Sequence, residues 1–197
     1  RAVLRAERGK AHQAQFRYMK LKQQVNPHFL FNSLNILDCL VCEQRTEQAS
    51  AYIHKLAGIY RYMLQNEEET LVRLREEMAF VGMYVDLLQV RFPEGFRVET
   101  DIPDEAMNRH VLPCSVQLLI ENAIKHNSVG ADRPLVIRIV AGAGAVTVSN
   151  NLQLKVSGTT STRVGLNYIR QQYLDLSGIP IGIRRTDTEY CVTLPLL

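Results

Sequence analysis

Apolar and polar positions along residues 28–41 repeat with the period of an α-helix. At about 100° per residue, four apolar side chains fall within a narrow arc and form one stripe: Leu30, Leu34, Leu37 and Val41. Three polar side chains, His28, Asn32 and Asn35, fall together roughly 150° away from that stripe. The pattern therefore predicts a helix that presents His28 on a polar face with two amides as neighbours.

A different apolar seam runs upstream of Pro27. Apolar residues recur there at heptad spacing: Leu4, Ala11, Tyr18 and Val25, with Ala14 and Leu21 offset by three. Pro27 removes one backbone donor and crowds the carbonyl four residues earlier, so we expect a kink or register break. We therefore predict one long helix over residues 3–44, kinked near Pro27, in which the change of seam turns His28 toward water.

A second helix is predicted over residues 47–66, where apolar residues recur at helical spacing from Ala49 to Leu64. Because the joint between the two helices is short, they should pack antiparallel as a hairpin. A lone hairpin buries too little surface to be stable, so we predict a homodimer whose two hairpins form a four-helix bundle. The polar residues 66–70 are a candidate hinge, which gives two domains, 1–70 and 71–197.

The second domain mixes helical and strand periods. Helices are predicted over 75–91, from Pro113 to 124, and over 165–176, and strands over 96–102, 135–140, 145–148, 180–185 and 189–194. This order suggests a mixed sheet with helices on one face. The predicted fold class is therefore α+β, a helical hairpin followed by an α/β sandwich.

Composition and charge exclude some functions. The chain has 197 residues, 46% hydrophobic and 22% charged, which is ordinary for a soluble globular protein. The net charge of +3 is too small to argue for direct binding of nucleic acid. No apolar run approaches the ~20 residues of a membrane span, and there is no signal peptide. Cys39 and Cys42 form a C-x-x-C pair without a second pair, so we expect reduced thiols.

His28 is the first candidate for chemistry. Neutral imidazole is populated near pH 7, so a histidine on a wet helix face can act as a nucleophile, although an ordinary surface histidine is the alternative. Residues 26–35 read Asn-Pro-His-Phe-Leu-Phe-Asn-Ser-Leu-Asn. This segment closely resembles the phosphoacceptor box of the LytS-type sensor histidine kinases, a bacterial two-component family. The resemblance implies that His28 accepts a phosphoryl group.

Residues 117–127 carry a second group of polar side chains. On a helix, Glu121, Asn122 and Lys125 share one flank. A carboxylate, an amide and a lysine there can hold a divalent cation and the phosphates of a nucleotide, because Mg²⁺ takes oxygen ligands and lysine neutralises phosphate. The alternative is a solvated Glu–Lys pair one turn apart, which is common.

The segment Glu-Asn-Ala-Ile-Lys-His within this helix is similar to the N box of the GHKL ATP-binding fold that histidine kinases use. The resemblance implies that Asn122 coordinates Mg²⁺ and that Lys125 and His126 lie near the phosphates of ATP. It also makes Glu121 a candidate polar group beside the γ-phosphate, and it places Asn127 at the flank of the same pocket.

Residues 161–170 resemble the last glycine box of the family, although only one glycine is present. The resemblance implies that Gly165 and Leu166 contact the nucleotide, since a glycine at a helix start lets backbone N–H groups approach phosphate. Residues 151–164 are polar and are similar to the mobile lid over ATP.

The chain departs from the family at Asn150 and Asn151, where the usual pattern is an acidic residue followed by glycines. In the family the acid accepts a hydrogen bond from the adenine amino group. An amide oxygen can still accept that bond, but without the assistance of charge, so we expect weaker affinity for ATP. A second departure, from many other histidine kinases, is Phe29, where an acid would serve as base for His28.

The resemblance spans roughly residues 15–197 and implies the cytoplasmic kinase core of a sensor in the bacterial inner membrane, with the membrane-spanning region upstream. It implies autophosphorylation of His28 by ATP and Mg²⁺, then transfer to an aspartate of a response regulator, one with a LytTR domain. Two alternatives stay open. One is a degenerate, non-catalytic dimeric scaffold, and the other is a GHKL ATPase without a histidine acceptor.

Overall fold

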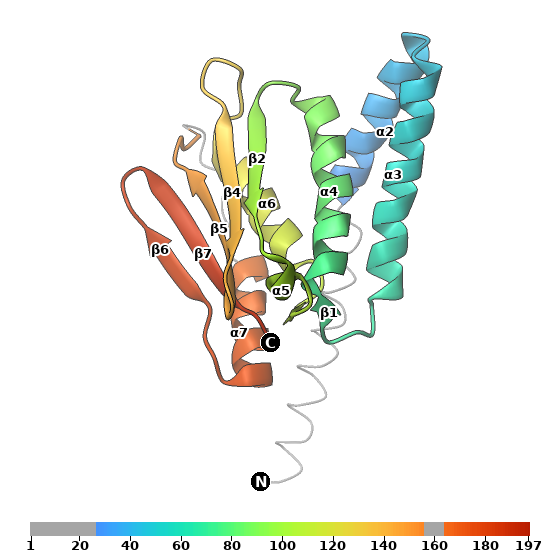
Figure 1. Cartoon of the computed structure of the whole chain (residues 1–197). Helices are drawn as coiled ribbons and strands as arrows, with labels where there is room; N and C mark the ends of the chain where they lie inside the picture. The colour runs from blue at the N-terminus through green and yellow to red at the C-terminus, as the bar shows by residue number, and fades with distance from the viewer. Residues whose placement is uncertain (1–26, 156–163) are drawn as a thin grey trace, which may run out of the picture. The chain divides into compact units, whose positions relative to one another are not determined.

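The computed structural model describes residues 27–155 and 164–197, and the predicted heptad helix before Pro27 lies outside them (Figure 1). The chain divides into two compact units, the first ending at Tyr60 and the second running from Arg61 to Leu197. The predicted domain boundary, after residue 70, lies further along the chain. The difference arises because Tyr62, in the last turn of the second helix, stacks on Phe80 of the second unit.

The first unit is built from two helices, α2 (Pro27–Cys42) and α3 (Thr46–Gln65), whose last turn belongs to the second unit. Helix α2 ends where Gln44 adopts a positive φ of 58°. The amides of Gln44 and Arg45 then donate to the carbonyls of Val41 and Leu40, at 3.0 and 2.9 Å, which is a Schellman motif. This tight turn confirms the predicted helical hairpin.

The apolar stripe predicted on α2 is not the side that the single chain buries. Ser33 and Leu40 are buried, whereas Leu34 is 47% and Val41 60% exposed. Helix α2 carries apolar side chains on two arcs, and the single chain buries the arc that includes Leu40. The buried pair lies roughly 80° from the centre of the predicted stripe.

The second unit contains a five-stranded sheet of strand order β2-β4-β5-β7-β6. Its strands are β2 (Phe96–Asp101), β4 (Leu135–Ala141), β5 (Ala145–Asn151), β6 (Gly182–Arg185) and β7 (Glu189–Pro195). The β2–β4 pair is parallel and the other pairs are antiparallel. The predicted mixed sheet and both predicted hairpins, β4–β5 and β6–β7, are confirmed.

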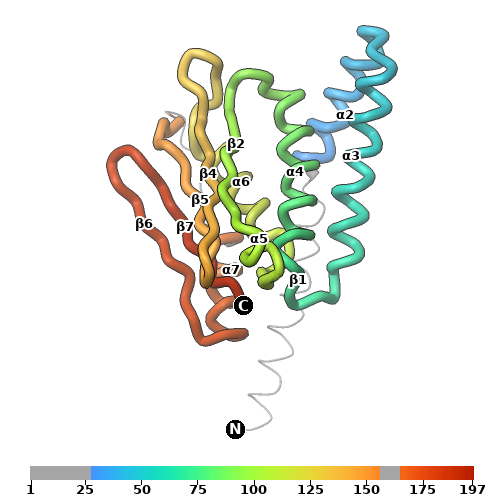
Figure 2. The backbone as a smooth tube through the Cα atoms, in the orientation of Figure 1, coloured from blue at the N-terminus to red at the C-terminus, as the bar shows by residue number. Residues whose placement is uncertain are grey.

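The sheet is covered on one face. Along β4, Leu135, Ile137 and Ile139 are fully buried and alternate with exposed Arg138 and Val140. Three long helices belong to this unit: α4 (Leu74–Arg91), α6 (Ser115–His126) and α7 (Val164–Ser177). Helix α6 packs on β4 and β5 and contacts both α4 and α7 (Figure 2). The predicted α+β fold class is confirmed.

The structure adds three short elements that the pattern did not predict. Strand β1 (Val72–Arg73) pairs with β3 (His110–Val111), and the four-residue helix α5 (Asp104–Met107) follows β2. Helix α6 begins at Ser115 rather than at Pro113, because Cys114 has a φ of 60° and cannot continue a right-handed helix. Within residues 27–155 and 164–197, no helix is both long and apolar enough to span a membrane.

Candidate functional site

His28 lies near the start of α2 with its side chain exposed to solvent. One turn later, the amide nitrogen of Asn32 lies 3.1 Å from Nδ1 and 3.4 Å from Nε2 of the ring. Asn35, a further turn along, is also exposed. The predicted orientation of His28, on a polar face beside amides, is confirmed. Its role as a nucleophile stays a prediction.

The start of helix α6 is held by a residue of α4. Cys114, the N-cap residue of α6, provides no side-chain cap. Instead, the fully buried carboxylate of Glu77 accepts from the backbone N–H groups of Cys114 at 2.8 Å, Val116 at 3.0 Å and Gln117 at 3.5 Å. A negative charge at a helix N-terminus satisfies these donors and is favoured by the helix dipole.

A fourth donor to Glu77 comes from the last turn of α3. The hydroxyl of Tyr62 donates to Oε2 at 2.8 Å, and its ring stacks on Phe80 with centroids 4.3 Å apart. Burial raises the pKa of Tyr62, and the charge of Glu77 raises it further. Glu77 is not one of the predicted site residues. The available signal was an acid at helical spacing from Leu74 and Val81, both of them buried.

The buried carboxylate predicts a pH dependence of stability. Burial raises the pKa of Glu77 from 4.5 to about 6, against hydrogen bonds that lower it. Because the folded value is the higher, this group's stabilising contribution is complete below the unfolded pKa and is lost as pH rises through about 6. The difference in unfolding free energy between wild type and Glu77→Gln should therefore fall by about 2 kcal/mol from about pH 4 to about pH 7.

Urea denaturation of both proteins across this range measures the difference. Groups that do not interact with Glu77 largely cancel between the two proteins, and Tyr62 and Tyr173, whose pKa values are raised, do not titrate in this range. A difference that stays constant, or that rises with pH, would contradict the prediction.

The middle of α6 carries a polar group that includes Glu121. Gln117 donates through Nε2 to Oε2 of Glu121 at 3.1 Å, one turn along the helix. Burial raises the pKa of Tyr84, on α4, and the charge of Glu121 raises it further. Asn122 is half-buried on the same helix, and Lys125 is exposed. Glu121 is therefore held by neighbours, whereas Lys125 projects into solvent.

Three cations, Arg91, Lys125 and Lys155, lie near the carboxyl end of α6 together with the imidazole of His126. The pKa of His126 is lowered by burial first, and then by the charges of Lys125 and Lys155. Burial also lowers the pKa of Lys155, and the charge of Arg91 lowers it further. Lys155 donates through Nζ to the last carbonyls of α6, at 3.1 and 3.2 Å. Mutual repulsion among these groups would be relieved by an anion, so the residues present fit a polyphosphate.

Three predicted site residues after α6, Asn127, Asn150 and Asn151, differ in the hydrogen bonds of their side-chain amides. Asn127 is buried, donates to the carbonyl of Ala123 at 2.8 Å and accepts from the amide of Gln153 at 2.9 Å. Asn151 accepts from the amide of Val136 at 2.8 Å and so extends the pairing of β4 with β5. Both side chains are engaged by backbone groups, which gives them a structural use.

Asn150 is different, because only its amide nitrogen is engaged. It is buried on β5 and donates to the carbonyl of Asn151 at 2.8 Å. Within the part of the chain that the structure describes, no hydrogen bond reaches its Oδ1. Of the two asparagines predicted to replace the adenine-binding acid, Asn150 therefore has the available acceptor.

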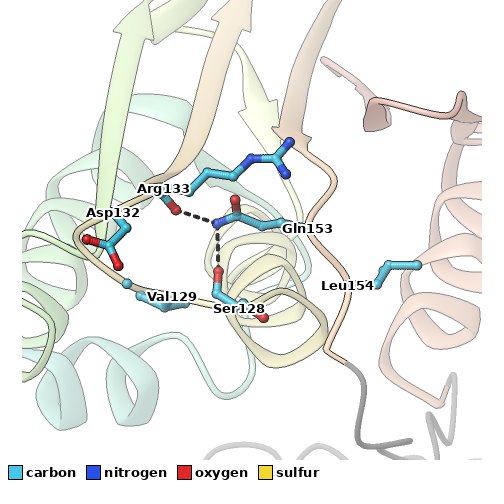
Figure 3. A pocket seen from close by; sticks show the side chains of 7 residues that line it. Ser128, Val129, Asp132, Arg133, Gln153 and Leu154 are labelled. Carbon is cyan, nitrogen blue, oxygen red and sulfur yellow. Dashed lines mark hydrogen bonds between the residues drawn. The ribbon is translucent and has the colours of Figure 1, made fainter.

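An open pocket of about 430 Å³ lies beside the segment after β5 (Figure 3). Its lining combines residues that follow α6 with residues that follow β5: Ser128, Val129, Gly130, Asp132, Arg133, Gln153 and Leu154. Gln153 donates through Nε2 to the carbonyls of Ser128 at 2.7 Å and Arg133 at 3.0 Å. None of the predicted site residues lines this pocket, although its first lining residue, Ser128, directly follows Asn127 in the chain.

Gly165 and Leu166 lie in the first turn of α7, and both are half-buried. The position of Gly165 near a helix start agrees with the predicted helix. Most of the predicted lid lies outside the described residues, which stop at Lys155 and resume at Val164.

Comparison of sequences finds similarity to a kinase family and to bacterial sensor proteins. The family model described as Histidine kinase matches residues 16–96. A Sensor protein LytS of Bacillus cereus is 39% identical over 106 residues, which cover 54% of this chain and 18% of that protein. A Sensor protein LytS of Staphylococcus haemolyticus is 29% identical over 190 residues, which cover 88% of this chain and 32% of that protein. The chain therefore spans less than a third of the length of these relatives.

Comparison of structures finds the Acinetobacter baumannii histidine kinase AdeS. It is 14% identical, with a TM-score of 0.44, over 94% of this chain and 96% of that chain.

Proposed function

We propose that the chain is a kinase core in which His28 accepts the γ-phosphoryl group of ATP. The premise is that the chain belongs to the LytS-type sensor histidine kinases. The observation that carries the proposal is the exposed imidazole of His28. It lies within the segment matched by the family model, on a helix face that also carries Asn32. The side chain is exposed to solvent, so a phosphorus atom can approach the ring.

The residues proposed to hold the nucleotide lie on α6 and around it. Asn122 would supply an oxygen to Mg²⁺, Lys125 and Lys155 would neutralise phosphate charge, and His126 would lie near the phosphates. Asn150 would accept from the adenine amino group through Oδ1. Mg²⁺, when bound, would offset the negative charge that builds up on the transferred phosphoryl group. Glu121, held by Gln117, would face the same end of the nucleotide.

We propose that two chains associate through their helical hairpins. The support is a set of large apolar side chains left in water on the two helices: Phe31, Leu34 and Val41 on α2, and Ile53 and Leu64 on α3. A monomer in water gains nothing from exposing them. Burial against a second hairpin would stabilise both copies and complete a four-helix bundle.

The remaining partners follow from the family. His28 would pass its phosphoryl group to an aspartate of a response regulator, which we propose to be of the LytTR type. We also propose that the full protein carries a membrane-spanning sensor region upstream and that this core faces the cytoplasm.

The proposal is tested by incubating the chain with Mg²⁺ and γ-labelled ATP, in parallel with a calorimetric titration of ATP. We expect label on the chain and binding that depends on Mg²⁺. The uncharged Asn150 in place of the usual acid favours one competing function, a scaffold that passes conformation to a partner without catalysis. No label, together with no binding at about 1 mM ATP, would support the scaffold instead.

A further inference from the structure

We propose that Tyr62 and Glu77 are positioning residues for the kinase reaction, and that the hydrogen bond between them ties the end of α3 to the start of α6. This inference rests on the proposed function, because α6 is the helix that carries Asn122 and Lys125. Neither Tyr62 nor Glu77 is proposed to touch the nucleotide.

The contacts of Glu77 connect it rigidly to α6. Its two oxygens receive three backbone donors from the N-cap residue and the first turn of that helix, at 2.8, 3.0 and 3.5 Å. The carboxylate is fully buried, so water offers no replacement for these bonds. A displacement of Glu77 would therefore move the start of α6, or leave backbone N–H groups without acceptors.

The contacts of Tyr62 connect the same carboxylate to α3. The hydroxyl reaches Oε2 at 2.8 Å, and the ring lies nearly parallel to Phe80, with an interplanar angle of 10°. Helix α3 is uninterrupted from Thr46 to Gln65, so rotation about its axis would carry Tyr62 with it. Such a rotation must break the bond to Glu77 or shift Glu77. The pair therefore couples the rotation of α3 about its axis to the position of α6.

The neighbouring Tyr60 provides a matched control on the same helix. Its hydroxyl is also buried, but it has no hydrogen-bond partner among the described residues. Tyr60→Phe and Tyr62→Phe remove the same atom two residues apart. Only the second removes a bond to Glu77, and it leaves a ring that can still stack on Phe80.

The experiment uses the whole chain with three variants, Tyr62→Phe, Tyr60→Phe and Glu77→Gln, and three measurements. These are the dissociation constant of Mg²⁺-ATP, the rate of labelling by γ-labelled ATP, and hydrogen–deuterium exchange. We expect Tyr62→Phe to slow labelling about tenfold, as loss of one bond to a charged acceptor allows, with nucleotide affinity unchanged within about twofold. Exchange should rise in residues 61–65, while the amides of residues 116 and 117 stay protected.

Glu77→Gln should weaken both nucleotide affinity and labelling and should also raise exchange at residues 116 and 117, because it disturbs α6 itself. Tyr60→Phe should change none of the three measurements. If Tyr62→Phe behaves like Tyr60→Phe, or if it lowers affinity and labelling equally, the positioning role is overturned. If the wild type takes up no label, the proposed function fails separately. The exchange pattern then still decides whether Tyr62 and Glu77 link α3 to α6.

Discussion

Replacement of His28 by glutamine should abolish labelling of the chain by γ-labelled ATP. Glutamine keeps a polar side chain of similar length on the exposed face of α2, but its amide is not a nucleophile. The loss should exceed about 1,000-fold, because no other group would replace the acceptor. Affinity for Mg²⁺-ATP should stay unchanged, since the residues proposed to bind the nucleotide lie in the other unit.

A second histidine in the same unit provides the control. His54 lies on α3, is also exposed, and its Nδ1 is 2.7 Å from the carbonyl oxygen of Ser50. His54→Gln should therefore label like wild type. The label should also be lost in acid and survive alkali, as expected for phosphorus bonded to an imidazole nitrogen. Label retained in His28→Gln would refute the assignment of the acceptor.

Replacement of Asn122 by alanine should slow labelling by about 100-fold or more. Asn122 is half-buried on α6, with Lys125 and His126 on the following turn. Its amide oxygen is the proposed protein ligand of Mg²⁺. Loss of a metal contact at the reacting phosphates costs several kcal/mol, and each 1.36 kcal/mol changes the rate about tenfold. The measurement is the initial rate of label uptake at saturating ATP across a range of Mg²⁺ concentrations.

Asn122→Asp separates loss of a ligand from loss of the fold. A carboxylate also supplies oxygen to Mg²⁺, so this variant should retain most of the labelling that alanine removes. Circular dichroism should show the same helix content for both variants. Equal labelling in Asn122→Ala and wild type would remove Asn122 from the proposed metal site.

The elements of the fold were predictable wherever a local pattern determined them. The β4 and β5 strands follow from alternation on either side of a glycine turn, and Gly178, with a φ of 69°, closes α7 as the sequence predicted. The β1–β3 pair was not predictable, since a two-residue strand has no period and its partner lies far along the chain. The burial of Ser33 depended on which of two apolar arcs of α2 the chain covers.

The residues of the candidate site also divide into those that the sequence predicted and those that it did not. Residues 26–35 and 121–126 were recognisable because the residues of each motif are consecutive in the sequence. The structural uses of Asn127 and Asn151 were not, because each depends on backbone groups from another segment. Glu77 was missed for the same reason, as three of its four donors come from residues 114–117. Contacts between distant segments leave little trace in a periodic pattern.

The order of strands has a consequence for how copies of this protein meet. The two edges of the sheet, β2 and β6, carry ionic side chains along unpaired backbone, with Arg97 and Asp101 on one and Arg184 and Arg185 on the other. Charge on an edge strand opposes the addition of a neighbouring chain's strand. Charge at both edges therefore disfavours continuous growth of the sheet from molecule to molecule.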